Sequence, residues 1–162
     1  MLRSLFVILA LLSVTAHAET VSGRVVGITD GDTLTLLDGS NQQHKIRLAG
    51  IDAPEKAQDF GQKAKTSLSA MAFNQKASAD CRKRDRYRRE ICVVSVGGKD
   101  VGLVQIRAGM AWWYRQYAKE QTAQERADYE QAEFKAKIHR FGLWSSKNPT
   151  PPWDWRHGLS DK

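Results

Sequence analysis

Four carboxylates lie in two short segments rich in turn-forming residues, and their types and spacing suit metal-assisted chemistry. Asp30 and Asp32 lie on either side of a glycine, and Asp52 and Glu55 bracket an Ala-Pro pair. Hard divalent cations bind carboxylate, carbonyl and water oxygens, so two converging loops can hold one with positions left for a substrate. We expect Asp32 and Asp52 to be such a pair. Ordinary turn chemistry explains the same residues, and this alternative stays open.

Two arginines extend the candidate site toward phosphate chemistry. Arg47 lies on the stretch that enters the second acidic segment, and Arg89 begins a later β-branched stretch. A cation with two guanidinium groups suits a phosphodiester, because phosphoryl transfer spreads negative charge over several oxygens. Glu55 is then the candidate general base that activates water. A structural alternative treats these acids and arginines as ion pairs that stabilise loops.

The segment 82–89 is strongly basic, with six Lys and Arg residues and one acid. Such a segment attracts phosphates, and contact with nucleic acid is favoured over the alternative of a solvated hairpin tip. An aromatic cluster at 112–117 contains Trp112, Trp113, Tyr114 and Tyr117. Some of these rings belong in the core, whereas exposed rings can stack on bases without reading sequence.

The elements that must position these residues are five short strands and about three helices. β-branched and alternating residues predict strands over 21–28, 33–37 and 43–49, one that ends near residue 81, and one over 89–96. Helical spacing predicts helices over 62–73 and 101–108, and a longer one after the capping box formed by Thr122 and Glu125. Five strands interrupted by a helix is the element order of an OB-fold barrel, and the order alone permits other small barrels.

The last long helix is expected to bury one face and solvate the other. Glu133 and Lys137 form an i,i+4 pair assigned to the solvent side. The residues expected to face the barrel are Tyr129, Ala132, Phe134, Ala136 and Ile138. The Pro-rich stretch 148–152 cannot continue a helix, and the sequence does not decide whether Trp153 and Trp155 fold back on the barrel.

Composition indicates a folded, basic, exported protein. The chain has 162 residues, a formal net charge of +7, 41% hydrophobic and 27% charged residues, which excludes a disordered chain and a multidomain assembly. Residues 1–18 predict a signal peptide, because Arg3 precedes an apolar run and an Ala-x-Ala cleavage pattern follows. The division expected is therefore a leader over 1–18, a domain over 19–147 and a tail over 148–162. The exported protein would be periplasmic or secreted.

Two cysteines, Cys81 and Cys92, are the only ones in the chain. In an oxidising compartment two thiols on neighbouring strands are expected to pair, whereas the scattered histidines leave no zinc-ligand spacing. We therefore expect a disulfide between them.

Taken together, the motifs resemble the thermonuclease family of staphylococcal nuclease. The resemblance covers nearly all of the chain after residue 18 and depends on the joint order of several motifs. They are Asp30-Gly31-Asp32-Thr33, Arg47-Leu48, Asp52-Ala53-Pro54-Glu55, Asp85-Arg86-Tyr87-Arg88-Arg89, the stretch 103–111, and Gly142-Leu143-Trp144-Ser145.

The resemblance implies an α+β fold, a five-stranded OB-fold barrel with about three helices, and calcium-dependent, sequence-nonspecific cleavage of DNA and RNA. It implies products with 3′ phosphates and calcium as the ion, and magnesium is the alternative ion. Apart from the resemblance, we expect a monomer by default and no membrane contact once the leader is removed. By position, the implied roles are metal ligands at Asp32, Asp52 and the Ala53 carbonyl, a nearby acid at Asp30, catalysis by Arg47, Glu55 and Arg89, and nucleotide contact by Tyr87 and Tyr117.

One departure from the family pattern concerns the second arginine. Where members commonly have Tyr-Gly-Arg, this chain has Tyr87-Arg88-Arg89, so a bulky cation stands at a turn that glycine usually fills. A shift of the turn by one residue would bring Arg88 rather than Arg89 to the phosphate. The main rival to a nuclease is a non-catalytic OB-fold module that binds single strands, and the intact set of acids favours the enzyme.

Overall fold

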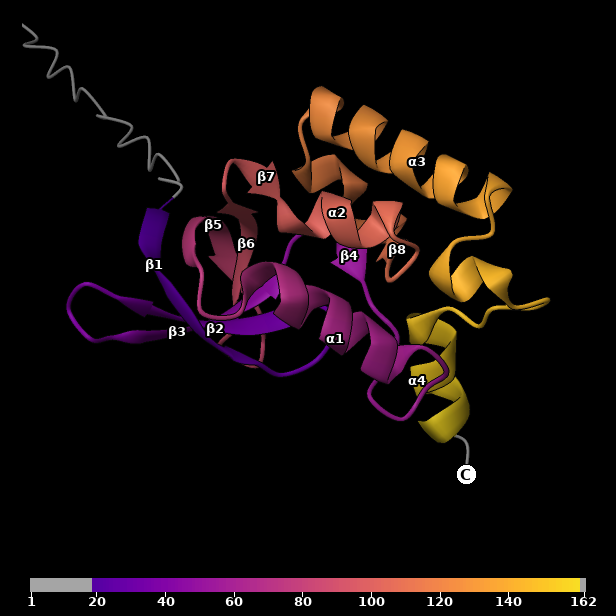
Figure 1. Ribbon diagram of the computed structural model, residues 1–162, viewed down its shortest axis with the longest axis horizontal. Coiled ribbons are helices and arrows are strands. Elements are labelled where there is room, and N and C mark those ends of the chain that lie inside the picture. The colour runs from indigo at the N-terminus through magenta and orange to yellow at the C-terminus, as the bar shows by residue number, and fades with distance from the viewer. Residues whose placement is uncertain (1–18, 161–162) are drawn as a thin grey trace, which may run out of the picture.

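A closed barrel of five long strands forms the centre of the computed structural model, which describes residues 19–160 (Figure 1). The predicted signal peptide over 1–18 lies outside the described residues. The strands are β1 (Glu19–Ile28), β2 (Thr33–Asp38), β3 (Gln43–Leu48), β5 (Lys76–Arg84) and β6 (Glu90–Val96). They run antiparallel in the order β3-β2-β1-β5-β6, and a parallel pairing of β3 with β6 closes the barrel. The predicted α+β OB-type barrel is confirmed.

Alternation of side chains along β3 separates the core from the candidate site. His44, Ile46 and Leu48 are buried, whereas Lys45 is exposed and Arg47 is half-buried. A strand points successive side chains to opposite faces, so packing of Ile46 in the core fixes the outward direction of Arg47. The register places Arg47 opposite Thr33 of β2 and Ile91 of β6. The arginine is therefore held between two neighbouring strands.

Three two-residue strands, absent from the predicted elements, complete the sheets. β4 (Ile51–Asp52) pairs with β8 (Trp112–Trp113), and β7 (Lys99–Asp100) pairs with the end of β6. The β4–β8 pairing places Asp52 opposite Trp112. The backbone of the second acidic segment is thus fixed by a distant part of the chain.

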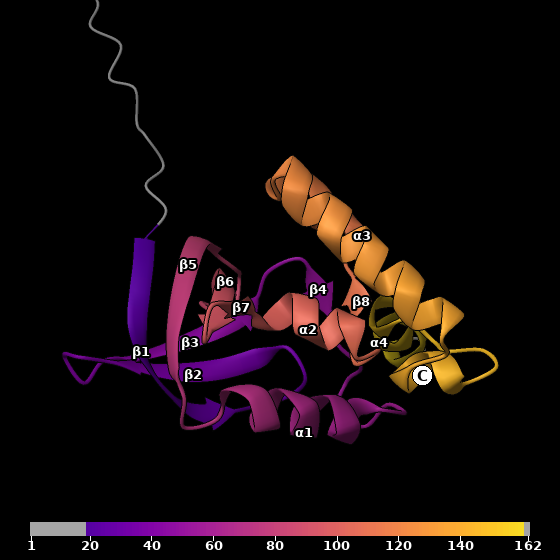
Figure 2. The same cartoon turned by 45° about the horizontal axis from the view of Figure 1, so that its top comes forward.

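Within residues 19–160, four α-helices and two 3-10 helices surround the barrel, whereas about three helices are predicted from the sequence. They are α1 (Gly61–Ala72), α2 (Val101–Arg107), η1 (Arg115–Glu120), α3 (Ala123–Ile138), η2 (Gly142–Ser145) and α4 (Pro152–Ser160). α2 packs against both α1 and α3 and lies between them (Figure 2). α4 begins at the proline that ends the Pro-rich stretch, a residue well suited to the first helical turn. None of the helices within 19–160 combines the length and apolar character of a membrane span.

The buried face of α3 differs from the predicted one. The capping box of Thr122 and Glu125 is present. The expectation that Phe134 and Ile138 face the barrel is wrong, because their side chains are 61% and 60% exposed. The other predicted core positions of this helix, Tyr129, Ala132 and Ala136, are buried.

Glu133 explains the rotation of the helix. It was assigned to the solvent side but is only 1% exposed, and its carboxylate accepts hydrogen bonds from the Trp113 backbone N–H at 3.0 Å and from Arg115 at 2.8 Å. The predicted pair with Lys137 is present at 2.8 Å. Three donors offset the cost of burying this charge, so the helix turns its acid inward.

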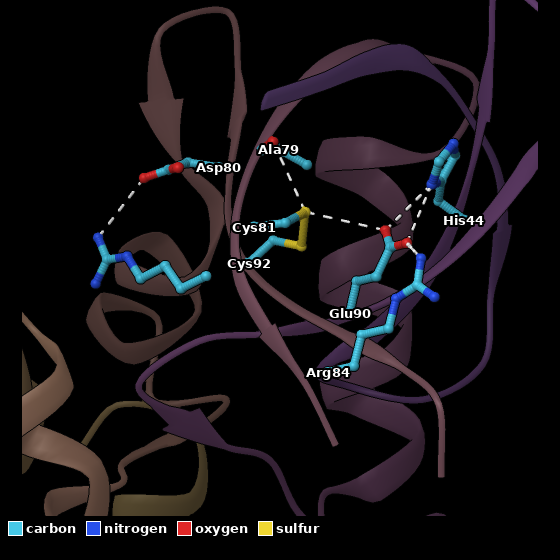
Figure 3. Close-up of a disulfide and its surroundings, with 8 residues drawn as sticks. His44, Ala79, Asp80, Cys81, Arg84, Glu90 and Cys92 are labelled. Carbon is cyan, nitrogen blue, oxygen red and sulfur yellow. Dashed lines mark hydrogen bonds and ion pairs between the residues drawn. A yellow bond between two sulfur atoms is a disulfide. The ribbon is translucent and has the colours of Figure 1, made fainter. Parts of the chain in front are cut away.

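The predicted disulfide between Cys81 and Cys92 is present and joins directly paired residues of β5 and β6 (Figure 3). The two cysteines are 11 residues apart, and the bond therefore closes a short loop that contains the basic segment. Closing a loop of this length removes conformational entropy from the unfolded chain.

Replacing both cysteines by alanine is expected to lower the free energy of unfolding by about 2–3 kcal/mol, the stabilisation that loop closure of this size provides. Urea unfolding of the double variant and the wild-type protein measures the difference. Reducing agent should lower wild-type stability by a similar amount and leave the double variant unchanged. Equal stability of the two oxidised proteins would contradict a structural role for the bond.

His44 bridges two carboxylates next to the disulfide. Its Nδ1 lies 3.1 Å from Glu90 Oε2 and its Nε2 lies 3.1 Å from Asp38 Oδ2, while Arg84 contacts Glu90 at 2.8 Å. Figure 3 shows His44 and Arg84 directed at the same carboxylate. Burial opposes the charge on His44, but the hydrogen bonds that its ring donates to Asp38 and Glu90 raise the pKa of this imidazole above its usual value. The protonated ring can donate to both acids at once.

Stability is expected to fall as the pH rises, because a raised folded-state pKa stabilises the protein fully only below the unfolded value of about 6.5 and is lost above the raised value. The loss should be about 1.5 kcal/mol, the lower end of what hydrogen bonds to charged groups contribute. Urea unfolding of wild-type protein at mildly acidic, neutral and mildly alkaline pH measures it. His44→Gln should flatten this dependence, whereas His139→Gln, at an exposed position, should retain it. A wild-type stability that rises over the same range would refute the bridge.

Candidate active site

The first acidic turn, which contains Asp30 and Asp32, follows β1 and packs tightly against α1 and the second acidic segment. A Cβ at Gly31 would lie 2.6 Å from the Ala64 Cβ and 2.7 Å from the Ala53 Cβ, so only glycine fits between α1 and the second acidic segment. Buried Gln105 of α2 donates to the Gly31 carbonyl at 2.8 Å. The turn is further closed by Asp30, which accepts the Asp32 backbone N–H at 3.1 Å. These contacts fix the direction of both carboxylates.

The two acidic segments converge, as the sequence predicts. Asp32 Oδ2 accepts the backbone N–H of Ala53 at 3.1 Å, and Asp32 Oδ1 accepts the Thr33 hydroxyl at 2.9 Å. Asp32 and Asp52 are 6% and 1% exposed. Two buried carboxylates from loops about twenty residues apart therefore share one location at an end of the barrel.

Arg47 lies between these carboxylates. Its Nη2 is 2.7 Å from Asp52 Oδ1 and 3.3 Å from Asp32 Oδ2. Like charges at close range repel, and the guanidinium offsets this repulsion. Arg47 is thus placed to meet any anion that approaches the two acids.

The acids differ in how readily they ionise. Burial is the largest single influence on Asp32 and opposes its charge, but Arg47 and the hydrogen bonds from the Ala53 N–H and the Thr33 hydroxyl together hold the pKa of Asp32 below its usual value. Burial raises the pKa of Asp52, against the opposing effects of Arg156 and Arg47. Burial and the neighbouring charge of Asp32 raise the pKa of Asp30 to about 6. Asp32 is therefore the firmest negative charge of the cluster at neutral pH.

Glu55 lies at the mouth of the cluster with a half-exposed side chain. Its backbone N–H donates to Gln58 Oε1 at 3.1 Å, and its carbonyl accepts the Gln58 N–H at 2.8 Å. A Cβ at Gly61 would lie 2.0 Å from the Glu55 carbonyl oxygen, so the start of α1 must be glycine for this loop to close. The loop is braced, and the half-exposed carboxylate pairs with Arg156 of α4 at 2.7 Å.

Arg89, not Arg88, faces the acids. Arg89 Nε donates to Asp85 Oδ2 at 2.8 Å, and Arg89 Nη1 contacts the Thr33 hydroxyl at 3.3 Å, the same hydroxyl that donates to Asp32. Arg88 adopts the left-handed conformation, φ 62°, with an exposed side chain. The turn therefore keeps the register that a glycine would give, and Arg88 tolerates the backbone strain.

A pocket with a volume of about 750 Å³ opens over the acids. Exposed Tyr87 and Tyr117 line its wall, with Lys83 Nζ 4.7 Å from the Tyr117 ring centroid. Its lining includes the basic residues Lys45, Arg47, Arg82, Lys83, Arg84, Arg86, Arg89 and Arg156. Buried carboxylates under a basic rim are suited to hold a cation below a polyanion.

A family model described as staphylococcal nuclease homologue matches residues 45–146, which is more than half of the chain and includes Arg47, Asp52, Glu55 and Arg89. The chain belongs to this nuclease family.

Individual proteins named as nucleases match this chain over most of its length. A protein of Haemophilus influenzae named an uncharacterized endonuclease is 40% identical over 156 residues, covering 96% of this chain and 84% of its own. A micrococcal nuclease of Shigella flexneri is 38% identical, with 92% and 87% covered. An uncharacterized endonuclease of Escherichia coli O157:H7 is 36% identical, with 85% and 86% covered. These matches support endonuclease activity in this chain.

Membership of the staphylococcal nuclease family implies a divalent cation, and the oxygen donors at the acidic cluster fit one. Asp32 and Asp52 offer buried carboxylate oxygens, the donor type that hard cations prefer. A second group of potential ligands, Cys81, Glu90 and Cys92, does not fit, because the two sulfurs are bonded to each other. Among the described residues, the acidic cluster therefore offers the oxygen donors that a hard divalent cation prefers.

Three residues of this staphylococcal nuclease homologue contribute to the site although the sequence does not single them out as site residues. Gln105 holds the first acidic turn, and Tyr114 lines the pocket with its ring 5.9 Å from the Arg47 guanidinium. Arg156 of α4 contacts Asp52 Oδ2 and Glu55 Oε1, each at 2.7 Å. Tyr114 lies in the predicted aromatic cluster, but nothing in the sequence near Arg156 signals a contact about a hundred residues away.

Proposed function

We propose that the protein is an exported, calcium-dependent endonuclease that hydrolyses DNA and RNA without sequence preference and leaves 3′ phosphates. The observation that carries this proposal is the convergence of buried Asp32 and Asp52 with Arg47 below a basic pocket. Magnesium is the second candidate for the ion. The polarity of cleavage and the choice of calcium come from the resemblance to staphylococcal nuclease.

Asp32, Asp52 and the carbonyl of Ala53 are the proposed cation ligands, with Asp30 as a nearby acid that keeps the first turn closed. When bound, the ion supplies charge that stabilises the phosphoryl oxygens in the transition state. Asp32 is well suited as a ligand because its pKa is lowered and its carboxylate is held by two hydrogen bonds.

Glu55 is the proposed general base, and Arg47 and Arg89 are the proposed phosphate-binding groups. Glu55 takes a proton from water, the new bond forms between the water oxygen and phosphorus, and the bond from phosphorus to the 5′ oxygen breaks. The departing oxygen takes a proton from solvent and becomes a 5′ hydroxyl. Arginine donors on the equatorial oxygens stabilise the charge that develops there.

Tyr87 and Tyr117 are the proposed base-stacking residues, with Arg88 at the outer edge of the same surface. Both rings are exposed, at 64% and 38%, on the pocket wall, and stacking on a ring does not distinguish bases. Binding through this basic surface should weaken steeply with salt, because phosphate contacts release counterions.

Export and a monomeric state complete the proposal. A disulfide suits an oxidising compartment, which is consistent with removal of residues 1–18 and a periplasmic or secreted protein of residues 19–162. Fractionation of cells into periplasm, cytosol and medium, with activity measured in each, tests this placement. Activity confined to the cytosol would contradict it.

The test of the function is digestion of labelled single-stranded DNA, duplex DNA and RNA in calcium, magnesium or EDTA, with product ends mapped. The proposal expects cleavage of all three in calcium, none in EDTA, and 3′ phosphates. Salt-sensitive binding without cleavage in either ion would instead support the rival non-catalytic OB-fold module, which the exposed rings and basic rim alone would also suit.

A further inference from the structure

The C-terminal helix inserts a cation into the acidic cluster. Arg156 Nη2 contacts Asp52 Oδ2 at 2.7 Å, and Arg156 Nη1 contacts Glu55 Oε1 at 2.7 Å and Asp52 Oδ1 at 3.3 Å. The guanidinium thus engages both oxygens of a proposed cation ligand and one oxygen of the proposed general base. Asp52 Oδ1 is shared with Arg47, which contacts it at 2.7 Å.

The helix that carries Arg156 is anchored independently of this ion pair. The Trp153 ring is stacked on Tyr114, with ring centroids 5.4 Å apart and an interplanar angle of 0°, and it packs edge-on against Trp112 at 5.6 Å. Before the helix, Gln58 Nε2 donates to the Thr150 carbonyl at 2.6 Å. The same Gln58 braces the backbone of Glu55, so the tail and the catalytic loop share a support. Figure 1 shows α4 at the end of the fold farthest from β1.

A guanidinium and a divalent cation cannot both occupy these oxygens at full contact. Two positive groups on one carboxylate repel each other strongly in a buried site. Asp52 already accepts two guanidinium groups, so a divalent cation added to the same oxygens would meet strong repulsion that the withdrawal of one guanidinium relieves. The Arg47 side chain is 13% exposed and lies between Thr33 and Ile91 of the neighbouring strands, whereas the Arg156 side chain is 40% exposed and can move into solvent. Arg156 is therefore the guanidinium group that a bound cation would displace from Asp52.

We propose that Arg156 competes with the divalent cation for Asp52 and blocks Glu55, so that α4 acts as a built-in inhibitor of the resting site. This inference rests on the proposed function, because it takes the acidic cluster as the cation site. Cation binding and Arg156 docking are then mutually exclusive states. The cation binds only the state in which Arg156 is released. Its apparent affinity is therefore reduced by the fraction of protein in which Arg156 is docked on Asp52.

Removing the competitor should tighten cation binding. Arg156→Gln is expected to bind calcium about tenfold more tightly than the wild-type protein, the effect of losing one charge-assisted contact. In EDTA the same variant should melt at a lower temperature, because Asp52 loses a partner, and calcium should remove that difference. Trp153→Ala, which weakens the anchor but keeps the arginine, should also tighten calcium binding, by a smaller factor.

The experiment is titration calorimetry of EDTA-stripped protein with calcium chloride, on residues 19–162 of each variant. The matched control is Arg86→Gln, which removes a positive charge from the same pocket where Arg86 lies over the Tyr87 ring. Tighter calcium binding in Arg156→Gln with little change in Arg86→Gln supports competition. Equal or weaker binding in Arg156→Gln, or equal tightening in both variants, overturns it while wild-type cleavage in calcium leaves the nuclease standing. No calcium binding by any protein overturns both the cation site and the competition.

Discussion

Glu55→Gln is expected to reduce cleavage of single-stranded DNA by about 10²–10⁴-fold, the usual contribution of a positioned general base. The amide keeps the size of the side chain but cannot take a proton from water. Because Glu55 is half-exposed and its loop is held by backbone contacts with Gln58, the variant should fold normally. Initial rates in saturating calcium, with circular dichroism of both proteins, measure the effect.

The matched control for this change is Glu120→Gln. Glu120 is an exposed carboxylate that lines the same pocket, but it pairs with Lys83 at 2.6 Å rather than facing the acidic cluster. Its loss should change the rate less than about threefold, because rim charges act mainly through the general field. Comparable losses in the two variants would show that the pocket needs negative charge, not a base at residue 55.

Arg89→Gln is expected to lower the rate by about 10²–10³-fold, as loss of one preorganised donor to a transition-state oxygen does. Arg89 is held toward Thr33 and Asp32 by Asp85, so its guanidinium is already oriented. Arg88→Gln should change the rate by only a few fold, through weaker attraction of the polyanion. The two variants change adjacent residues and remove the same charge, so Arg88→Gln is the matched control for Arg89→Gln.

Salt dependence separates the two arginines further. The small effect of Arg88→Gln should vanish at high salt, where screening removes long-range attraction, whereas the effect of Arg89→Gln should persist. If Arg88→Gln were the more damaging change, the turn would rearrange on substrate binding and Arg88 would be the phosphate ligand.

The sequence predicts those parts of the site that local pattern determines. Alternation around Ile46 places Arg47 on the outer face of β3, and the turn chemistry at Asp30 and Asp52 ends strands that meet at one end of the barrel. The basic segment joins two strands clamped by the predicted disulfide. Each of these features depends on a few neighbouring residues, either on turn-forming residues or on the alternation of side chains between the two faces of a strand.

The features that escaped prediction depend on contacts between distant segments. The orientation of α3 is decided by Glu133, whose partners Trp113 and Arg115 lie about twenty residues earlier, and helical periodicity carries no information about them. Arg156 contacts Asp52 although the two residues are about a hundred positions apart in the sequence. It lies on α4, which begins only at the last proline of the Pro-rich stretch. No local pattern contains such a contact, since packing of Trp153 on Tyr114 creates it.

The measurement that tests the central claim most directly is a calcium titration of wild-type protein, followed both by the heat of binding and by the rate of single-stranded DNA cleavage. The account predicts one cation per chain, with binding and cleavage rising over the same calcium range and both abolished by Asp52→Asn. Cleavage that persists in EDTA, or full calcium binding by Asp52→Asn, would contradict the assignment of the acidic cluster as the catalytic cation site.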